Sequence, residues 1–194
     1  MKILHLMLII FIYFCFAENN LKDVQDVIKT ECGYGQIYLA ADRSAYNDNL
    51  GKKLDSCPLC EKLQMQTDDQ NFILKRTKHS YVCLNYYPYM KGHLLVLPQR
   101  HVGDLSMLTD EEFIDLNFLI RESVSVLKQW KAEGINVGIN LGKLAGASIP
   151  DHLHVHILPR FNYNLNYAFF LSNIIVIDES LETVFPQLKR LFLA

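Results

Sequence analysis

The sequence predicts an α+β fold, in which a five-stranded antiparallel sheet is accompanied by one long helix and a C-terminal helix. Five short runs of aliphatic and aromatic residues are bounded by turn-forming or charged residues, as β-strands usually are. One long amphipathic stretch separates the third run from the fourth, and most connections are short. Strands grouped around a single helix are typical of the α+β class.

The predicted strands cover residues 71–77, 80–86, 92–98, 135–141 and 152–159. Each is four to eight residues of mostly Val, Ile, Leu and aromatic side chains, and the last is expected to close at its proline. The second and third are joined by the segment YYPYMKG, which is expected to form a turn.

The long helix is predicted to begin after Thr109, which serves as its N-cap. Glu112 follows three residues later and completes a capping box, in which each side chain bonds a free backbone N–H of the other residue. Gly134 is expected to end the helix. One face is apolar at three- and four-residue steps, and this stripe is interpreted as core: Phe113, Leu116, Ile120, Val124, Leu127 and Trp130. A C-terminal helix over 179–192 is expected to be broken or bent at Pro186.

The N-terminal segment is set apart from the fold by its composition. Residues 1–17 combine one lysine, an apolar run of 14 residues and a small residue at the exit, which is the pattern of a signal peptide. The alternatives are an anchor helix or an extension from a misassigned start. Residues 18–35 are expected to form a linker or short helix, and the globular domain is expected to span residues 36–194. The location of the protein is left open among secretory, membrane-anchored and cytoplasmic. Contact with a membrane is expected only through an uncleaved N-terminus.

The charge balance excludes one class of partner. Nineteen basic and 21 acidic residues give a net charge of −2, and no strongly basic stretch is present. Binding to DNA or RNA is therefore not expected, because it requires a basic surface.

Cys57 and Cys60 form a C-x-x-C motif in SCPLCEK. This spacing is typical of zinc ligands, and it is also compatible with a disulfide or with two free thiols. Cys83 lies in an apolar run, where a buried free thiol is the simplest interpretation.

The segment DHLHVHILPR contains a row of three histidines, His152, His154 and His156, at every second position. Along a strand, alternate side chains point to the same face. The three imidazoles are therefore predicted to share an open face of the sheet, while the aliphatic residues between them point into the core. Imidazole acts near neutral pH as a metal ligand, nucleophile or proton donor.

The loop before this row is rich in glycine and small residues. Gly142 and Gly146 let backbone N–H groups approach an anion closely, and Asn140, Lys143 and Ser148 add further donors. A loop of this kind beside a row of histidines is interpreted as a phosphate cradle next to an imidazole nucleophile.

These motifs resemble the histidine triad (HIT) superfamily of nucleotide hydrolases and transferases. The segment HLHVHIL matches its His-φ-His-φ-His-φ-φ signature. The similarity extends to the zinc-containing bacterial-type branch related to diadenosine-tetraphosphate phosphorylases and hydrolases, and it is carried by SCPLCEK, LNYYPYMKGHLLVLPQRHV, LTDEE, VGINLGKLAGASIPDHLHVHILPR and IDESLE. The resemblance implies a HIT-type α+β domain and, because relatives commonly dimerise, a homodimer.

The resemblance also implies an enzyme with a nucleotide substrate and a covalent intermediate. His154 would attack the α-phosphorus of a dinucleoside polyphosphate such as diadenosine tetraphosphate, and His156 would donate a hydrogen bond to the phosphate or leaving group. Ser148 and Asn140 would contact phosphate oxygens, and Asn85 would contact the nucleoside. A nucleoside phosphoramidase and a catalytically silent nucleotide-binding protein are the alternatives.

The same resemblance implies a structural zinc ion. Cys57, Cys60, His101 and His152 match the four ligands of zinc-bearing relatives, and four protein ligands would leave no position for substrate. His93 also matches a family position, but it is interpreted as a buried structural histidine. The run FNYNLNYAFF departs from the family pattern, so the preferred base and the acceptor are not predicted.

Overall fold

The computed structural model describes residues 56–65, 67–162 and 179–194. The segments predicted as signal or anchor (1–17) and as linker (18–35), and the run that departs from the family pattern (161–170, apart from its first two residues), lie outside the described residues. In the part of the chain that is described, no helix is both long and apolar enough to cross a membrane.

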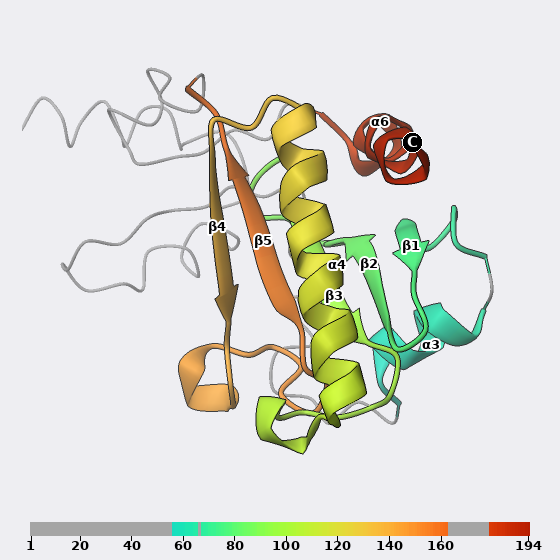
Figure 1. The fold of residues 1–194 in the computed structure, drawn as a ribbon, viewed down its shortest axis with the longest axis vertical. Coiled ribbons are helices and arrows are strands. Elements are labelled where there is room, and N and C mark those ends of the chain that lie inside the picture. Colours follow the sequence, from blue (N-terminus) through green and yellow to red (C-terminus); the bar gives the residue numbers. More distant parts are fainter. Residues whose placement is uncertain (1–55, 66, 163–178) are drawn as a thin grey trace, which may run out of the picture. The chain divides into compact units, whose positions relative to one another are not determined.

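The predicted five-stranded antiparallel sheet is confirmed (Figure 1). Its strands are β1 (Ile73–Arg76), β2 (Ser80–Leu84), β3 (Leu94–Pro98), β4 (Gly134–Ile139) and β5 (Val155–Arg160). They are arranged in the order β1-β2-β3-β5-β4, and every neighbouring pair is antiparallel. The insertion of β5 between β3 and β4 gives the strand that carries His156 a hydrogen-bonded partner on each side.

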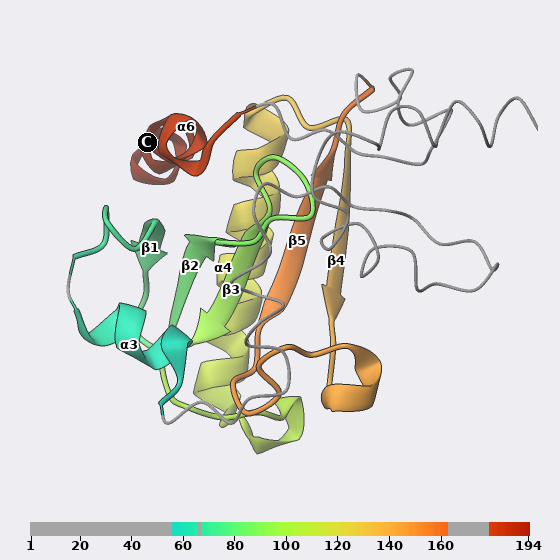
Figure 2. The same cartoon turned by 180° about the vertical axis from the view of Figure 1, so that it is seen from behind.

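The two faces of the sheet pack against different layers. One face and the helices α4 (Asp110–Gln129) and α6 (Leu181–Leu193) share the main hydrophobic cluster, which includes Val82, Leu84, Val155 and Ile157. The alternate residues of β2, Tyr81 and Cys83, point to the other face and pack there against the short helix α3. Figures 1 and 2 show α4 lying across the sheet, with α3 beside the β1–β2 end.

Helix α4 begins as predicted and ends earlier than predicted. The Thr109 hydroxyl accepts from Glu112 N–H, and the Glu112 carboxylate accepts from Thr109 N–H, so the capping box is confirmed. The prediction that Gly134 ends the helix is wrong, because the helix stops at Gln129 and Gly134 opens β4. Lys131 adopts a left-handed φ of 69°, and Ala132 N–H bonds back to Leu127 O, which terminates the helix without a glycine.

Two further predictions about the helices need correction. Phe113 was expected in the core but is 46% exposed, because the buried face of α4 instead runs through Leu116, Leu119, Val126 and Leu127. Helix α6 was expected to break or bend at Pro186; it does not break there, because it is one continuous helix over its 13 residues. Pro186 is the sixth residue of α6 and has no N–H for the Glu182 carbonyl, so one intrahelical hydrogen bond is absent there.

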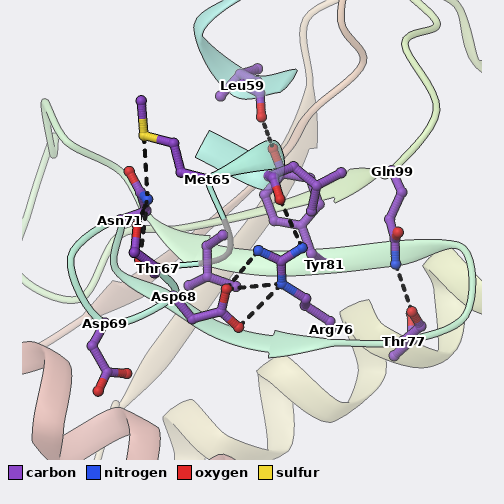
Figure 3. A network of polar contacts seen from close by, with 12 residues as sticks. Leu59, Met65, Thr67, Asp68, Asp69, Asn71, Arg76, Thr77, Tyr81 and Gln99 are labelled. Atoms are coloured by element: carbon purple, nitrogen blue, oxygen red, sulfur yellow. Dashed lines mark hydrogen bonds and ion pairs between the residues drawn. The ribbon is translucent and has the colours of Figure 1, made fainter. Parts of the chain in front are cut away.

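Helix α3 (Pro58–Gln64) was not predicted, and it carries the C-x-x-C motif. Two side chains of the sheet hold its backbone (Figure 3): the Tyr81 hydroxyl donates to Leu59 O at 3.0 Å, and Arg76 Nη1 donates to Leu63 O at 3.0 Å. The remaining Arg76 nitrogens bind the Asp68 carboxylate, which fixes the guanidinium. Helix α3 is thus anchored to β1 and β2 through its own carbonyl groups.

We expect Tyr81→Phe to lower the free energy of unfolding by about 1–3 kcal/mol, since it leaves a buried carbonyl of α3 without its partner. The measurement is urea denaturation at neutral pH. Tyr86→Phe is the matched control, because Tyr86 is 56% exposed. Equal stabilities for the two variants would show that the Tyr81 hydroxyl does not anchor α3.

Candidate active site and metal centre

Four side chains from three parts of the chain converge into a metal-binding geometry. Cys57 caps α3, Cys60 lies in its first turn, His101 follows β3, and His152 precedes β5. Their ligand atoms all lie within 4.8 Å of one another. The structure therefore brings together the whole set of ligands that the resemblance implied.

The distances within this cluster suit a tetrahedral ion. The Sγ to Nδ1 separations are 3.3 Å for Cys57–His152, 3.3 Å for Cys60–His101 and 3.4 Å for Cys60–His152. A tetrahedral zinc with usual bond lengths would separate a sulfur and a nitrogen ligand by about 3.5 Å. Both cysteines are free thiols in this structure.

His152 is held in the neutral form that can bind a metal ion. His152 Nε2–H donates to the Pro98 carbonyl at 3.0 Å, which leaves the Nδ1 lone pair directed at the two cysteines. Burial lowers the pKa of His152, so its neutral, ligating form is favoured. Burial and the neighbouring Cys57 raise the pKa of Cys60 to about 11, so the thiol keeps its proton until a cation displaces it.

The backbone of His152 fixes the orientation and the tautomer of the His154 ring. Its Nδ1 lies 2.7 Å from the His152 carbonyl oxygen, which can only accept, so Nδ1 carries the proton. Nε2 is then the unprotonated nitrogen, and its lone pair is available for attack on an electrophile. His154 is 5% exposed, which limits competition from water.

His156, the candidate hydrogen-bond donor, lies beside the candidate nucleophile His154. The rings of His154 and His156 meet edge to face with centroids 5.0 Å apart. His156 Nδ1 lies 2.9 Å from Nε2 of the fully buried His93, and the ring of Tyr89 stacks on His156. Burial, with a smaller contribution from His154, lowers the pKa of His156 to about 4.

The prediction that the three histidines share an open strand face is wrong. Strand β5 begins at Val155, and the chain before it bonds to the loop after β3 through Leu153 N–H and Val102 O at 2.6 Å. His152 and His154 are consequently buried outside the ladder, and only His156 belongs to a strand. Because the backbone before Val155 does not follow a strand, the His152 ring faces the cysteines, while the rings of His154 and His156 remain in contact.

The loop between β4 and β5 is open and shaped by two glycines. Gly142 and Gly146 adopt left-handed φ angles of 81° and 93°, and the Asn140 amide lies next to Gly146. Ser148 is exposed in the same loop. Within the described residues, no hydrogen bond joins Asn140 or Ser148 to the histidines, so their role toward a phosphate stays a prediction.

His93 is a buried structural histidine, as predicted, and it also bonds His156, while Tyr89 was not predicted to belong to the site. The polar His93 precedes the otherwise apolar strand β3, and this contrast was the available signal. It follows Gly92, whose φ is 75° and where a Cβ would overlap the Trp130 ring, so only glycine fits. The Asn85 side chain, predicted to contact a nucleoside, donates to His93 Nδ1 at 3.1 Å.

Comparison with protein-family models matches residues 66–163, half of the chain, to the HIT domain. The chain belongs to the HIT domain family. Its sequence is 39% identical over 125 residues to the AP-4-A phosphorylase of Mycobacterium tuberculosis strain H37Rv, covering 64% of this chain and 60% of the relative. It is 43% identical over 89 residues to an asymmetrical bis(5'-nucleosyl)-tetraphosphatase of Schizosaccharomyces pombe, covering 45% and 48%. The chain thus spans about half to three fifths of the length of these relatives.

Solved structures agree with the fold assignment. A zinc-bound histidine triad family protein from Mycobacterium smegmatis superposes with a TM-score of 0.58 at 23% identity, over 71% of this chain and 94% of that protein. The NitFhit protein of C. elegans superposes with a TM-score of 0.51 at 30% identity, over 62% of this chain and 27% of that protein. The family assignment and the α+β fold made from sequence are both confirmed.

Proposed function

We propose that this HIT domain is a nucleotidyl hydrolase or transferase that cleaves a dinucleoside polyphosphate such as diadenosine tetraphosphate. The observation that carries the proposal is the tautomer of His154, whose Nδ1–H is held by the His152 carbonyl at 2.7 Å. The names of two relatives, an AP-4-A phosphorylase and a bis(5'-nucleosyl)-tetraphosphatase, support this class of substrate.

The proposed reaction is a double displacement. His154 Nε2 attacks the α-phosphorus, the bond from phosphorus to the bridging oxygen breaks, and its electron pair leaves with the nucleoside polyphosphate. Water or inorganic phosphate then attacks the nucleotidyl-histidine and releases the second product. Dividing the reaction at a covalent intermediate replaces one difficult displacement with two easier ones.

Hydrogen-bond donors around His154 would bind the phosphate groups and the nucleoside during this reaction. His156 lies beside the nucleophile and would hydrogen-bond the phosphate or the bridging oxygen. Asn140, Ser148 and the open glycine loop would bind the non-bridging oxygens, and Asn85 would also face the nucleoside. Donors aimed at the developing negative charge are each worth about 3 kcal/mol.

We expect the full-length chain to convert diadenosine tetraphosphate to ATP and AMP in water, or to ATP and ADP when inorganic phosphate is the acceptor. His154→Ala should lower turnover at least ~10³-fold, because no other group supplies the nucleophile. Chromatography of the products, with and without phosphate, distinguishes hydrolase from phosphorylase.

His79→Ala serves as the matched control for this experiment, since His79 lies in the β1–β2 turn. Turnover by His154→Ala equal to that of the control would rule out the proposed nucleophile. Tight nucleotide binding without products would instead indicate a silent binding protein, and cleavage confined to P–N bonds would indicate a phosphoramidase.

We further propose that the cluster of two cysteines and two histidines binds one structural Zn²⁺. Four protein ligands fill the coordination of a tetrahedral ion, so the metal would join α3 to the segment before β5 and would not contact substrate. The anchoring of α3 by Tyr81 and the Pro98 bond to His152 hold both halves of the site at ligand distance.

Metal analysis of protein purified under reducing conditions should find about one zinc per chain. Cys60→Ser should lose this zinc, since it removes one of the two thiolate ligands. Cys83→Ala is the control, because Cys83 is buried on β2 and outside the cluster. A metal-free wild type with Cys57 and Cys60 joined as a disulfide would contradict the zinc assignment.

We also propose a homodimer formed along β4. Among the described strands, β4 lies at an edge of the sheet, and an edge strand can pair with a strand of a second copy. Val137 of β4 is 49% exposed, and α4 exposes Phe113, Ile114 and Phe118 at 46–54%. Exposed large apolar residues of this kind mark interaction surfaces.

Phe118→Glu should shift the chain from dimer to monomer in sedimentation equilibrium, because it places a charge in the proposed interface. Leu193→Glu, a change of the same type at the exposed C-terminus, should leave the dimer intact. A monomeric wild type, or a Phe118→Glu protein that stays dimeric, would contradict this assignment.

A further inference from the structure

A chain of four hydrogen bonds leads from the β2–β3 connection to His156. Tyr87 N–H donates to Asn85 Oδ1 at 3.1 Å, and Asn85 Nδ2 lies 3.1 Å from His93 Nδ1. Tyr89 N–H donates to the same His93 Nδ1 at 3.2 Å. His93 Nε2 then lies 2.9 Å from His156 Nδ1.

The directions of these bonds follow from the donors. Because a backbone N–H binds Asn85 Oδ1, the amide presents its NH₂ group to His93. Two donors therefore point at His93 Nδ1, which must be an unprotonated acceptor. The proton of His93 is then on Nε2 and is donated to His156 Nδ1, so the proton of neutral His156 is on Nε2.

The same series of hydrogen bonds disfavours the imidazolium form of His156. A second proton on His156 Nδ1 would face the Nε2–H of His93, and His93 cannot move its proton to Nδ1 while Asn85 and Tyr89 both donate there. The Cα partners of His156 on the neighbouring strands, Leu95 and Gly138, carry no charge. Among the described residues, the titratable side chains in contact with His156 are His93, His154 and Tyr89, and none is a carboxylate.

We propose that Asn85 is a positioning residue that fixes His156 as a neutral Nε2–H donor and thereby restricts the site to leaving groups that depart without a proton. This inference rests on the proposed function, because it concerns the first displacement by His154. It assigns to Asn85 a role that differs from nucleoside contact, and it selects phosphoric anhydrides over phosphoramidates.

The selection follows from the bond that breaks. In an anhydride, the electron pair of the P–O bond leaves on a nucleoside polyphosphate, which is a stable anion and needs only a hydrogen bond from His156. In a phosphoramidate, the electron pair of the P–N bond leaves on nitrogen, which must gain a proton to depart as an amine. A neutral imidazole cannot supply this proton effectively, whereas an imidazolium with a pKa near the working pH can.

The direct test is the replacement Asn85→Asp, in which a carboxylate replaces the amide that donates to His93. The carboxylate can only accept, so it favours a proton on His93 Nδ1 and leaves His93 Nε2 as an acceptor. His156 is then favoured with a proton on Nδ1 and can take a second proton on Nε2. Gln129→Glu is the matched control, an amide-to-acid change at the exposed end of α4.

The first readout is the ¹⁵N NMR spectrum of histidine-labelled full-length protein, recorded over pH 4–8 without substrate. In wild type and Gln129→Glu, His156 should be the neutral Nε2–H tautomer and should gain a second proton only below pH 5. Asn85→Asp should raise the pKa of His156 toward the ordinary value of about 6.5. If the pKa of His156 is unchanged in Asn85→Asp, or if wild-type His156 is not the Nε2–H tautomer, the inference is overturned.

The second readout is kcat/KM for diadenosine tetraphosphate and for adenosine 5'-phosphoramidate. Asn85→Asp should raise the ratio of P–N to P–O cleavage at least about tenfold, with its pH optimum moved toward the new pKa, and Gln129→Glu should leave the ratio unchanged. An unchanged ratio would overturn the restriction on leaving groups. If neither substrate is cleaved while the NMR change occurs, the proposed function fails and the positioning of His156 by Asn85 stands.

Discussion

The hydrogen bond from His154 Nδ1 to the His152 carbonyl is the contact on which the site depends. His152 meets the cysteines through its ring and meets His154 through its backbone, so one residue belongs to both centres. Its ring is oriented by Pro98 O, and its backbone N–H bonds to Ile149 O. Any change that moves His152 therefore alters the cluster of metal ligands and the tautomer of the neighbouring histidine together.

The sheet provides the rigid frame for this arrangement. One face is filled by α4 and α6, and the other is covered at its β1–β2 end by α3. This division holds the cysteines against the β1–β2 half while β5 carries His156 in the interior of the sheet. Buried hydrogen-bonded networks of this kind fix a single arrangement, because an unpaired polar group in the interior is costly.

Local signals in the sequence were sufficient for the number of strands and for the start of α4, since the Thr109–Glu112 capping box needs only neighbouring residues. The end of α4 was mispredicted because Lys131 takes a conformation that usually requires glycine. The metal ligands were foreseen by resemblance and their convergence was found, but the burial of His152 and His154 was not, because strand periodicity was assumed before Val155. The bond from His93 to His156 joins residues 63 positions apart, and no local pattern predicts it.

His154 is proposed to carry the nucleotide during turnover, and this covalent intermediate can be trapped. The full-length protein would be mixed with diadenosine tetraphosphate, quenched within milliseconds under conditions that preserve phosphorus–nitrogen bonds, and digested for mass spectrometry. If His154 is the nucleophile, one adenylyl group should be found on the peptide that contains His154, localised to that residue and absent from His154→Ala. Products released at a normal rate with no adenylyl group on this peptide, or an adenylyl group on a different residue, would contradict this proposal.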